Sequence, residues 1–74
     1  MPTEVEAEIA GNVWKVETQV GAAVEEEDVL LILESMKMEI PVVVEDPGTL
    51  VEILVEEGQS VVGGQPVAVI EESS

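Results

Sequence analysis

The chain has 74 residues, 46% of them hydrophobic, with a single tryptophan as its aromatic content and neither cysteine nor histidine. This length holds one domain, spanning 1–74, without disulfides or thiolate metal sites. Seventeen acidic residues against two lysines give a formal net charge of −15, which repels the phosphates of nucleic acid and of anionic lipids. We therefore expect neither a nucleic-acid nor a membrane partner, and the lack of a long apolar stretch favours a soluble, cytoplasmic protein.

The residue types also argue against catalysis. Without histidine or cysteine, no Ser-His or Cys-His pair can form. Carboxylates are so frequent that no single pair of them stands out. The acidic run at residues 25–28 lacks the ligand spacing of a known cation-binding loop, so a solvated turn is the simpler interpretation. We expect a non-enzymatic protein with no catalytic residues and no metal site.

Eight short segments are typical of β-strands, because they alternate polar and apolar residues or are continuously apolar between turn residues. In the second segment, Trp14 and Val16 are expected on one face. Pro41 lacks a donor N–H, so its strand is predicted to start there or to lie at a sheet edge. A turn is expected at residues 11–12, and the tail at residues 71–74 is expected to fray. The predicted strands are residues 4–9, 13–18, 23–24, 29–34, 40–44, 49–55, 60–62 and 66–70.

An internal repeat relates the two halves of the chain. Residues 8–34 align with residues 45–71 without a gap, at a constant spacing of 37 positions, as between Gly11 and Gly48. A second glycine pair and the apolar positions of the strands match at the same spacing. Two copies are too few for a solenoid. We therefore predict an all-β fold: a flattened β-barrel (a barrel-sandwich hybrid) of two pseudo-two-fold related four-stranded halves.

Lys37 is predicted to lie at the tip of a hairpin, because strand-like apolar runs flank residues 32–40 on both sides. The turn Ser-Met-Lys-Met lacks the Gly, Asn or Asp that tight turns prefer. A requirement other than folding is therefore expected to have selected these residues. Because the repeat relates Lys37 to the C-terminal end of the chain, we expect this lysine at one end of the barrel and both termini at the other.

Residues 34–38, Glu-Ser-Met-Lys-Met, resemble the attachment hairpin of biotinyl domains, the biotin carboxyl carrier modules of biotin-dependent carboxylases. The similarity extends from about Val5 to Ile70 and includes the glycine spacing. It implies that Lys37 holds biotin covalently, as an amide on its ε-amine. It also implies a biotin protein ligase as the modifying partner. The working partners implied are the biotin carboxylase and carboxyltransferase subunits of an ATP-dependent carboxylase of acyl-CoA or pyruvate type.

Four neighbours of the lysine are candidates for recognition by this ligase. Met36 and Met38 either fill the core beneath the tip or contact the ligase, and in an extended segment both would point to the face opposite Lys37. Glu34 and Glu39 match acidic positions of the family, but generic solvated charge is an equally simple explanation for Glu39.

Two other functions are compatible with the sequence. Lipoyl domains share the fold and the lysine hairpin, so lipoate on Lys37, in a 2-oxoacid dehydrogenase-type complex, is the nearer alternative. Lipoyl hairpins typically place Asp before the lysine and Ala after it, where this chain has Met36 and Met38. This difference favours biotin. The second alternative is a non-enzymatic acidic interaction module, which needs no modified lysine.

Four further features of the sequence lead to expectations. Glu27 stands where the first half-domain of the family usually has a glycine, and the repeat aligns it with Gly64. If that position needs a positive φ, Glu27 is strained or the turn differs. The connection between residues 20 and 29 is too short for the protruding thumb of some bacterial carriers. The scarcity of basic residues predicts a halophilic source, where salt screens the repulsion between carboxylates. The initial Met1 favours a standalone subunit.

Overall fold

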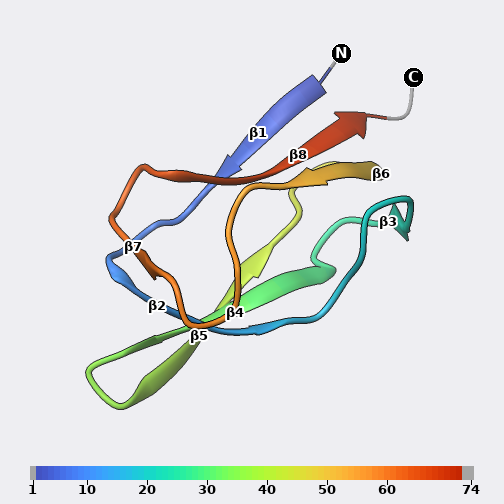
Figure 1. Cartoon of the computed structure of the whole chain (residues 1–74). Coiled ribbons are helices and arrows are strands. Elements are labelled where there is room, and N and C mark those ends of the chain that lie inside the picture. Colours follow the sequence, from blue (N-terminus) through green and yellow to red (C-terminus); the bar gives the residue numbers. More distant parts are fainter. Residues whose placement is uncertain (1, 73–74) are drawn as a thin grey trace.

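The computed structural model describes residues 2–72, which form eight strands and no helix (Figure 1). The strands are β1 (Pro2–Glu6), β2 (Gly11–Val16), β3 (Ala23–Val24), β4 (Val29–Ser35), β5 (Met38–Val43), β6 (Gly48–Ile53), β7 (Ser60–Val61) and β8 (Pro66–Glu72). They form two antiparallel sheets, with the strand orders β1-β8-β6-β3 and β5-β4-β2-β7. This arrangement confirms the predicted all-β fold and places Pro41 on an edge strand.

The predicted two-fold repeat is present in the pairing of the strands. Val13 of β2 is opposite Leu33 of β4, and Leu50 of β6 is opposite Ile70 of β8, so the two pairs are related by the same spacing of 37 positions. A β-bulge follows at the same place in both, directly after Val13 and directly after Leu50. The two-residue strands are exchanged, since β3 pairs with β6 and β7 pairs with β2. The halves are therefore interlocked, and neither sheet belongs to one half alone.

The interior is built from aliphatic side chains alone. The largest fully buried residues are leucines and valines, among them Leu30, Leu31, Leu33 and Leu50. Among residues 2–72 no polar or charged side chain is buried. Each described carboxylate therefore stays in contact with solvent, and the charge is accommodated without a desolvation cost. The described part of the chain contains no helix with the length and hydrophobicity needed to cross a membrane.

The bulge in β2 corrects the expected orientation of Trp14. The register of β2 against β4 shifts between Val13 and Lys15, so the strict alternation of faces is lost at this point. Val13 is buried and Val16 half-buried, whereas Trp14 is 48% exposed. Trp14 and Val16 therefore do not share a face, because a bulge adds one residue that a simple period of two does not count.

The expected turn at residues 11–12 was also wrong, since Gly11 begins β2. Glycine is needed there for close approach and not for a turn. A Cβ atom on Gly11 would lie 2.8 Å from the carbonyl oxygen of Glu34 and 3.4 Å from the Cβ of Ser35. The absence of a side chain lets β2 pack directly against the end of β4, where the Lys37 hairpin begins.

The two ends of the described chain are paired with each other, since Pro2 is opposite Glu71. Figure 1 shows this end of the barrel opposite the β4–β5 hairpin, as the repeat predicted. The expectation of a frayed tail was wrong for Glu71 and Glu72, because both continue β8 and pair with the start of β6. Residues 73–74 of that predicted tail lie outside the described residues.

Glu27 keeps the turn that its glycine counterpart forms. Its φ is +72°, and the φ of Gly64 is +85°. The backbone N–H of Glu27 donates to the carbonyl of Val44 (2.7 Å), and the N–H of Gly64 donates to that of Ala7 (2.8 Å), at equivalent places in the two halves. The turn is therefore not redrawn, and Glu27 adopts a left-handed conformation that costs a residue with a Cβ about 1–2 kcal/mol.

Candidate functional site

The β4–β5 hairpin ends in a loop of two residues, Met36 and Lys37. The last strand pair is Ser35 with Met38. Both loop residues have positive φ, +51° for Met36 and +67° for Lys37. Two positive φ angles in a two-residue loop are the pattern of a type I′ turn, for which Asn-Gly and Gly-Gly are the preferred sequences.

The loop sequence is therefore unfavourable for the conformation it adopts. A left-handed conformation costs a residue with a Cβ about 1–2 kcal/mol. Burial does not compensate for this cost, because the side chain of Met36 is 92% exposed and Lys37 is exposed as well. Strain of this kind, in residues that the core does not need, is typical of functional sites. The geometry thus agrees with the sequence-based interpretation that folding did not select these residues.

The methionines do not fill the core. Met38 is 63% exposed, and Met36 is almost fully exposed. The loop is a tight turn, so the premise of an extended segment, with both methionines opposite Lys37, was wrong. Both thioethers lie on the surface at the tip of the hairpin. The core-filling interpretation is excluded, and contact with another protein remains the interpretation that the exposure supports.

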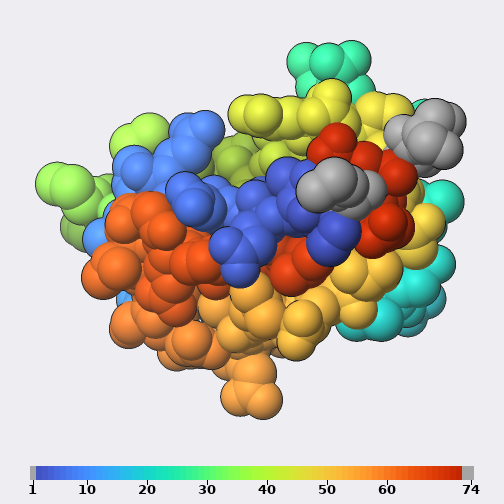
Figure 2. Space-filling model, turned by 90° about the horizontal axis from the view of Figure 1, so that it is seen from above, coloured from blue at the N-terminus to red at the C-terminus, as the bar shows by residue number. Residues whose placement is uncertain are grey.

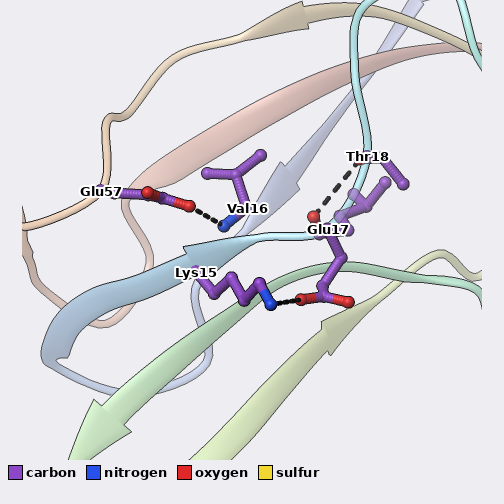
Figure 3. A network of polar contacts seen from close by, with 6 residues as sticks. Lys15, Val16, Glu17, Thr18 and Glu57 are labelled. Atoms are coloured by element: carbon purple, nitrogen blue, oxygen red, sulfur yellow. Dashed lines mark hydrogen bonds and ion pairs between the residues drawn. The ribbon is translucent and has the colours of Figure 1, made fainter.

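The two lysines of the chain have different surroundings. Lys15 lies on β2 beside a network of polar contacts (Figure 3), and its Nζ is 3.8 Å from Oε1 of Glu17. In that network the N–H of Val16 donates to the Glu57 carboxylate (2.9 Å). Lys37 has no acidic partner within 4.0 Å among residues 2–72. The yellow-green tip of the β4–β5 hairpin projects at the left of Figure 2, remote from the red end of β8.

A row of polar residues crosses the second sheet just below the tip. Ser60 of β7 is opposite Asn12 of β2, Asn12 is opposite Glu34 of β4, and Glu34 is opposite Glu39 of β5. All four residues are exposed. The hydroxyl of Ser60 donates to Oδ1 of Asn12 (2.8 Å). We call Ser60, Asn12, Glu34 and Glu39 the polar row.

The structure thus brings Glu34 and Glu39 together as direct neighbours, and it adds two members that the sequence did not reveal. Asn12 and Ser60 are distant from the hairpin in sequence and reach it only through the pairing of β2 with β4 and with β7. A hydroxyl or amide in a strand segment is too common to be singled out from sequence. The only available signal was the register of β2 against β4, which the bulge obscures.

This arrangement makes an amine accessible for modification. Lys37 presents a primary amine on a flexible four-carbon stem, exposed at the tip of the hairpin. No group of three or more acidic residues among residues 2–72 is arranged to hold a metal ion. The accessible amine fits a group attached through an amide, because an acylating enzyme can reach it and the product can extend away from the surface.

The fold and the exposed lysine together define a class of protein, namely small β-barrel domains that present a lysine on a hairpin at one end. Comparison with known proteins identifies the family. The family model described as "Biotin-requiring enzyme", the biotin/lipoyl model, matches residues 1–70. The chain belongs to the biotin/lipoyl attachment family.

Relatives with assigned names fall into two size groups. The biotinylated protein TB7.3 homologue of Mycobacterium leprae is 40% identical over 70 residues, covering 95% of this chain and 99% of the relative. The biotin/lipoyl attachment protein of Bacillus subtilis is 44% identical over 57 residues, covering 77% of this chain and 78% of its own length. A putative urea carboxylase of Emericella nidulans is 41% identical over 71 residues. This match covers 92% of the present chain but only 6% of the length of that carboxylase.

Solved structures support the same assignment. The urea carboxylase of Kluyveromyces lactis matches with a TM-score of 0.92 and 35% identity, over 96% of this chain and 6% of that one. A single-chain, multi-domain long-chain acyl-CoA carboxylase matches with a TM-score of 0.91 and 32% identity, over 97% of this chain and 7% of the other. The chain is therefore similar to carrier domains that form small parts of large carboxylases.

Proposed function

We propose that this chain is a biotin carboxyl carrier and that Lys37 is its attachment residue. The observation that supports this most directly is the strained loop, which holds an exposed lysine between two exposed methionines. Lys15 is the weaker candidate because it lies along a strand, next to a carboxylate. In the proposed role the chain is non-catalytic, since partner enzymes make and break the bonds.

The contribution of the chain is placement. In the proposed modification the ligase joins the ε-amine of Lys37 to the carboxyl group of biotin as an amide, with loss of one water overall. When bound, biotin supplies a ureido ring that accepts a carboxyl group at one active site and releases it at another. The aliphatic stem of Lys37 provides reach, and the rigid barrel keeps the arm at one end of the molecule. Tethering in this way replaces free diffusion with a high effective concentration near both sites.

The partners we propose are a biotin protein ligase, a biotin carboxylase and a carboxyltransferase of an ATP-dependent carboxylase. The similarity to urea and long-chain acyl-CoA carboxylases supports a carboxylase setting. An acyl-CoA or pyruvate acceptor is our proposal for the transferase step, with a cytoplasmic location. The ligase is proposed to contact Met36, Met38, Glu34 and Glu39, because all four side chains are exposed around the tip.

The test is the intact mass of the protein after co-expression with a biotin protein ligase. The wild-type chain is expected to gain the mass of one biotinyl group, and Lys37→Arg is expected to gain none. Lys15→Arg is the matched control, because it changes the other lysine in the same way and should still be modified. Full modification of the Lys37→Arg variant would refute the assignment.

Lipoate is the second candidate for the same lysine. A relative from Staphylococcus saprophyticus named as the dihydrolipoyllysine-residue succinyltransferase component of the 2-oxoglutarate dehydrogenase complex is 35% identical over 74 residues, covering 18% of its length. The methionines flanking Lys37 favour biotin. Parallel co-expression with a lipoyl ligase separates the two, since modification by that ligase alone would favour a dehydrogenase-type complex. Modification by neither ligase would favour an acidic interaction module.

A further inference from the structure

A groove separates the outer edges of the two sheets. β1 pairs only with β8, and β5 pairs only with β4, so each is an edge strand. Among the described residues, no Cα atom of β1 lies within 8 Å of a Cα atom of β5. Paired strands lie about 4.7–4.9 Å apart, so the two edges are not joined to each other. A cavity of about 550 Å³ lies between them, and Figure 2 shows the blue segment of β1 beside the yellow-green segment of β5.

The groove lies on the pseudo-two-fold axis, and its floor is symmetric. Leu33 and Ile70 line it from the neighbouring strands β4 and β8, and Val5 and Val42 line it from the two edges. Each of these pairs has the repeat spacing of 37 positions. The floor is therefore apolar on both sides, as expected for the margin of a core.

The walls, in contrast, differ in chemistry although the repeat makes them equivalent. β1 contributes Glu4 and Glu6, and the equivalent positions of β5 are Pro41 and Val43. All four are exposed. One wall of the groove is therefore acidic and the other apolar. Among the described residues that line the cavity there is no lysine or arginine, and Glu8, Glu45, Asp46 and Glu72 add four carboxylates to the lining.

We propose that this groove binds an extended segment of another protein, with basic side chains toward β1 and apolar side chains toward β5. Edge strands accept extended peptides by adding a strand, and the flanking surfaces then select the side chains. Charge complementarity identifies the segment as basic, since the described residues that line the cavity include six acidic side chains and no lysine or arginine. A second copy of this chain is a poor occupant, because two copies of charge −15 repel each other.

This surface is separate from the proposed attachment site. Lys37, the methionines and the polar row do not line the cavity. Docking here would hold a partner along the side of the barrel and leave the lysine tip free. The proposal therefore goes beyond the carrier function, and Lys37→Arg is expected to bind the segment as tightly as the wild-type chain.

The probe is a fluorescent octapeptide in which lysine and valine alternate, with binding followed by anisotropy on the full chain. The comparison peptide has the same composition, with the lysines in one block and the valines in another. The alternating peptide is expected to bind more tightly, because an extended chain then presents opposite chemistries to the two walls. In amide NMR spectra, the shifts are expected along β1 and β5.

Two variants distinguish a built groove from general attraction to an acidic protein. Glu4→Gln with Glu6→Gln should weaken binding roughly three- to tenfold, while the matched control, Glu26→Gln with Glu56→Gln, removes the same charge elsewhere and should have less effect. Val43→Glu adds negative charge to the apolar wall. Non-specific attraction predicts tighter binding of the alternating peptide by this variant, and the groove predicts weaker binding.

Three results would overturn the proposal. The first is equal binding of the two peptides, and the second is tighter binding by Val43→Glu. The third is a dimer of the unmodified chain, detected by light scattering at physiological salt, that buries β1 and β5. NMR shifts confined to other strands would have the same consequence, because the peptide would then occupy another surface.

Discussion

Glu34 and Glu39 lie directly opposite each other on β4 and β5, one residue pair below the pair that closes the Lys37 loop. Like charges in this position of an antiparallel pair destabilise a sheet. No described lysine pairs with either carboxylate. The sheet therefore retains a repulsive pair at the base of the hairpin that is proposed to bind the ligase.

Replacing one of these carboxylates should stabilise the fold and impair modification. Glu39→Gln is expected to raise the free energy of unfolding by about 0.2–1 kcal/mol, because it removes the repulsion. Urea denaturation checks the stability, and the rate of biotin incorporation by a ligase checks recognition. Glu52→Gln is the control, since Glu52 is opposite Val69 and not opposite another carboxylate. An unchanged rate of incorporation would remove Glu39 from the proposed ligase contact.

The strained tip gives a second prediction. Met36→Gly should raise the free energy of unfolding by about 1 kcal/mol, because glycine adopts a positive φ without the cost that a Cβ imposes. Lys37 is unchanged in this variant, so a loss of biotin incorporation would show that the ligase needs the side chain of Met36. Ser35→Gly, in the last strand pair before the loop, is the control and should destabilise the hairpin. A lower unfolding midpoint for Met36→Gly would contradict the strain argument.

Glu27 gives a third prediction, remote from the site. Glu27→Gly should raise the free energy of unfolding by about 1 kcal/mol, because its φ of +72° suits glycine. Glu26→Gly removes the same charge from the adjacent residue, which does not have a positive φ, and it should be neutral or destabilising. Thermal unfolding of both variants provides the comparison. Equal stabilisation of the two would assign the effect to charge and not to the backbone.

The acidity gives a fourth prediction, and with it we propose a salt-rich source environment. The free energy of unfolding should be higher in molar potassium chloride than in dilute buffer, because salt screens the repulsion among the 17 acidic residues. All the described carboxylates contact solvent, and Lys15–Glu17 is the ion pair that residues 2–72 show. Salt therefore screens mainly repulsion between carboxylates, because there is little attraction between opposite charges for it to weaken. Equal stability in both buffers would contradict the prediction.

The control is the same comparison of high and low salt, repeated at acidic pH. At a pH low enough to protonate the carboxylates, the repulsion is removed. The difference between high and low salt should then shrink. A salt effect of the same size in acid would show that potassium chloride acts through apolar burial and not through screening.

Much of the fold could be predicted from local patterns. β4 and β8 were predicted because residues 29–34 and 66–70 are apolar runs next to turn residues, and the two strands have the same burial pattern in the structure. The lysine tip was predicted because the flanking runs and the repeat indicated the same place. These features depend on residue type and spacing, which the sequence displays directly.

Other features depend on pairing between distant segments and were not predicted. The bulge at Trp14 is defined only by the register of β2 against β4. Asn12 and Ser60 join Glu34 for the same reason, since three strands must be aligned before the polar row exists. The exposure of Met36 follows from a tight turn that its residue type does not favour. The tip of the candidate site and its residues Glu34 and Glu39 could thus be predicted, whereas Asn12 and Ser60 could not.

The exchange of β3 and β7 between the halves has a consequence for the connection that holds Lys37. A single repeat of this chain could bury its apolar face only by associating with a second copy as a symmetric homodimer. Fusing two such copies in tandem joins the end of one copy to the start of the next. That joint is the loop between β4 and β5. Lys37 lies in this connection, so the lysine marks the junction between the two halves of the chain.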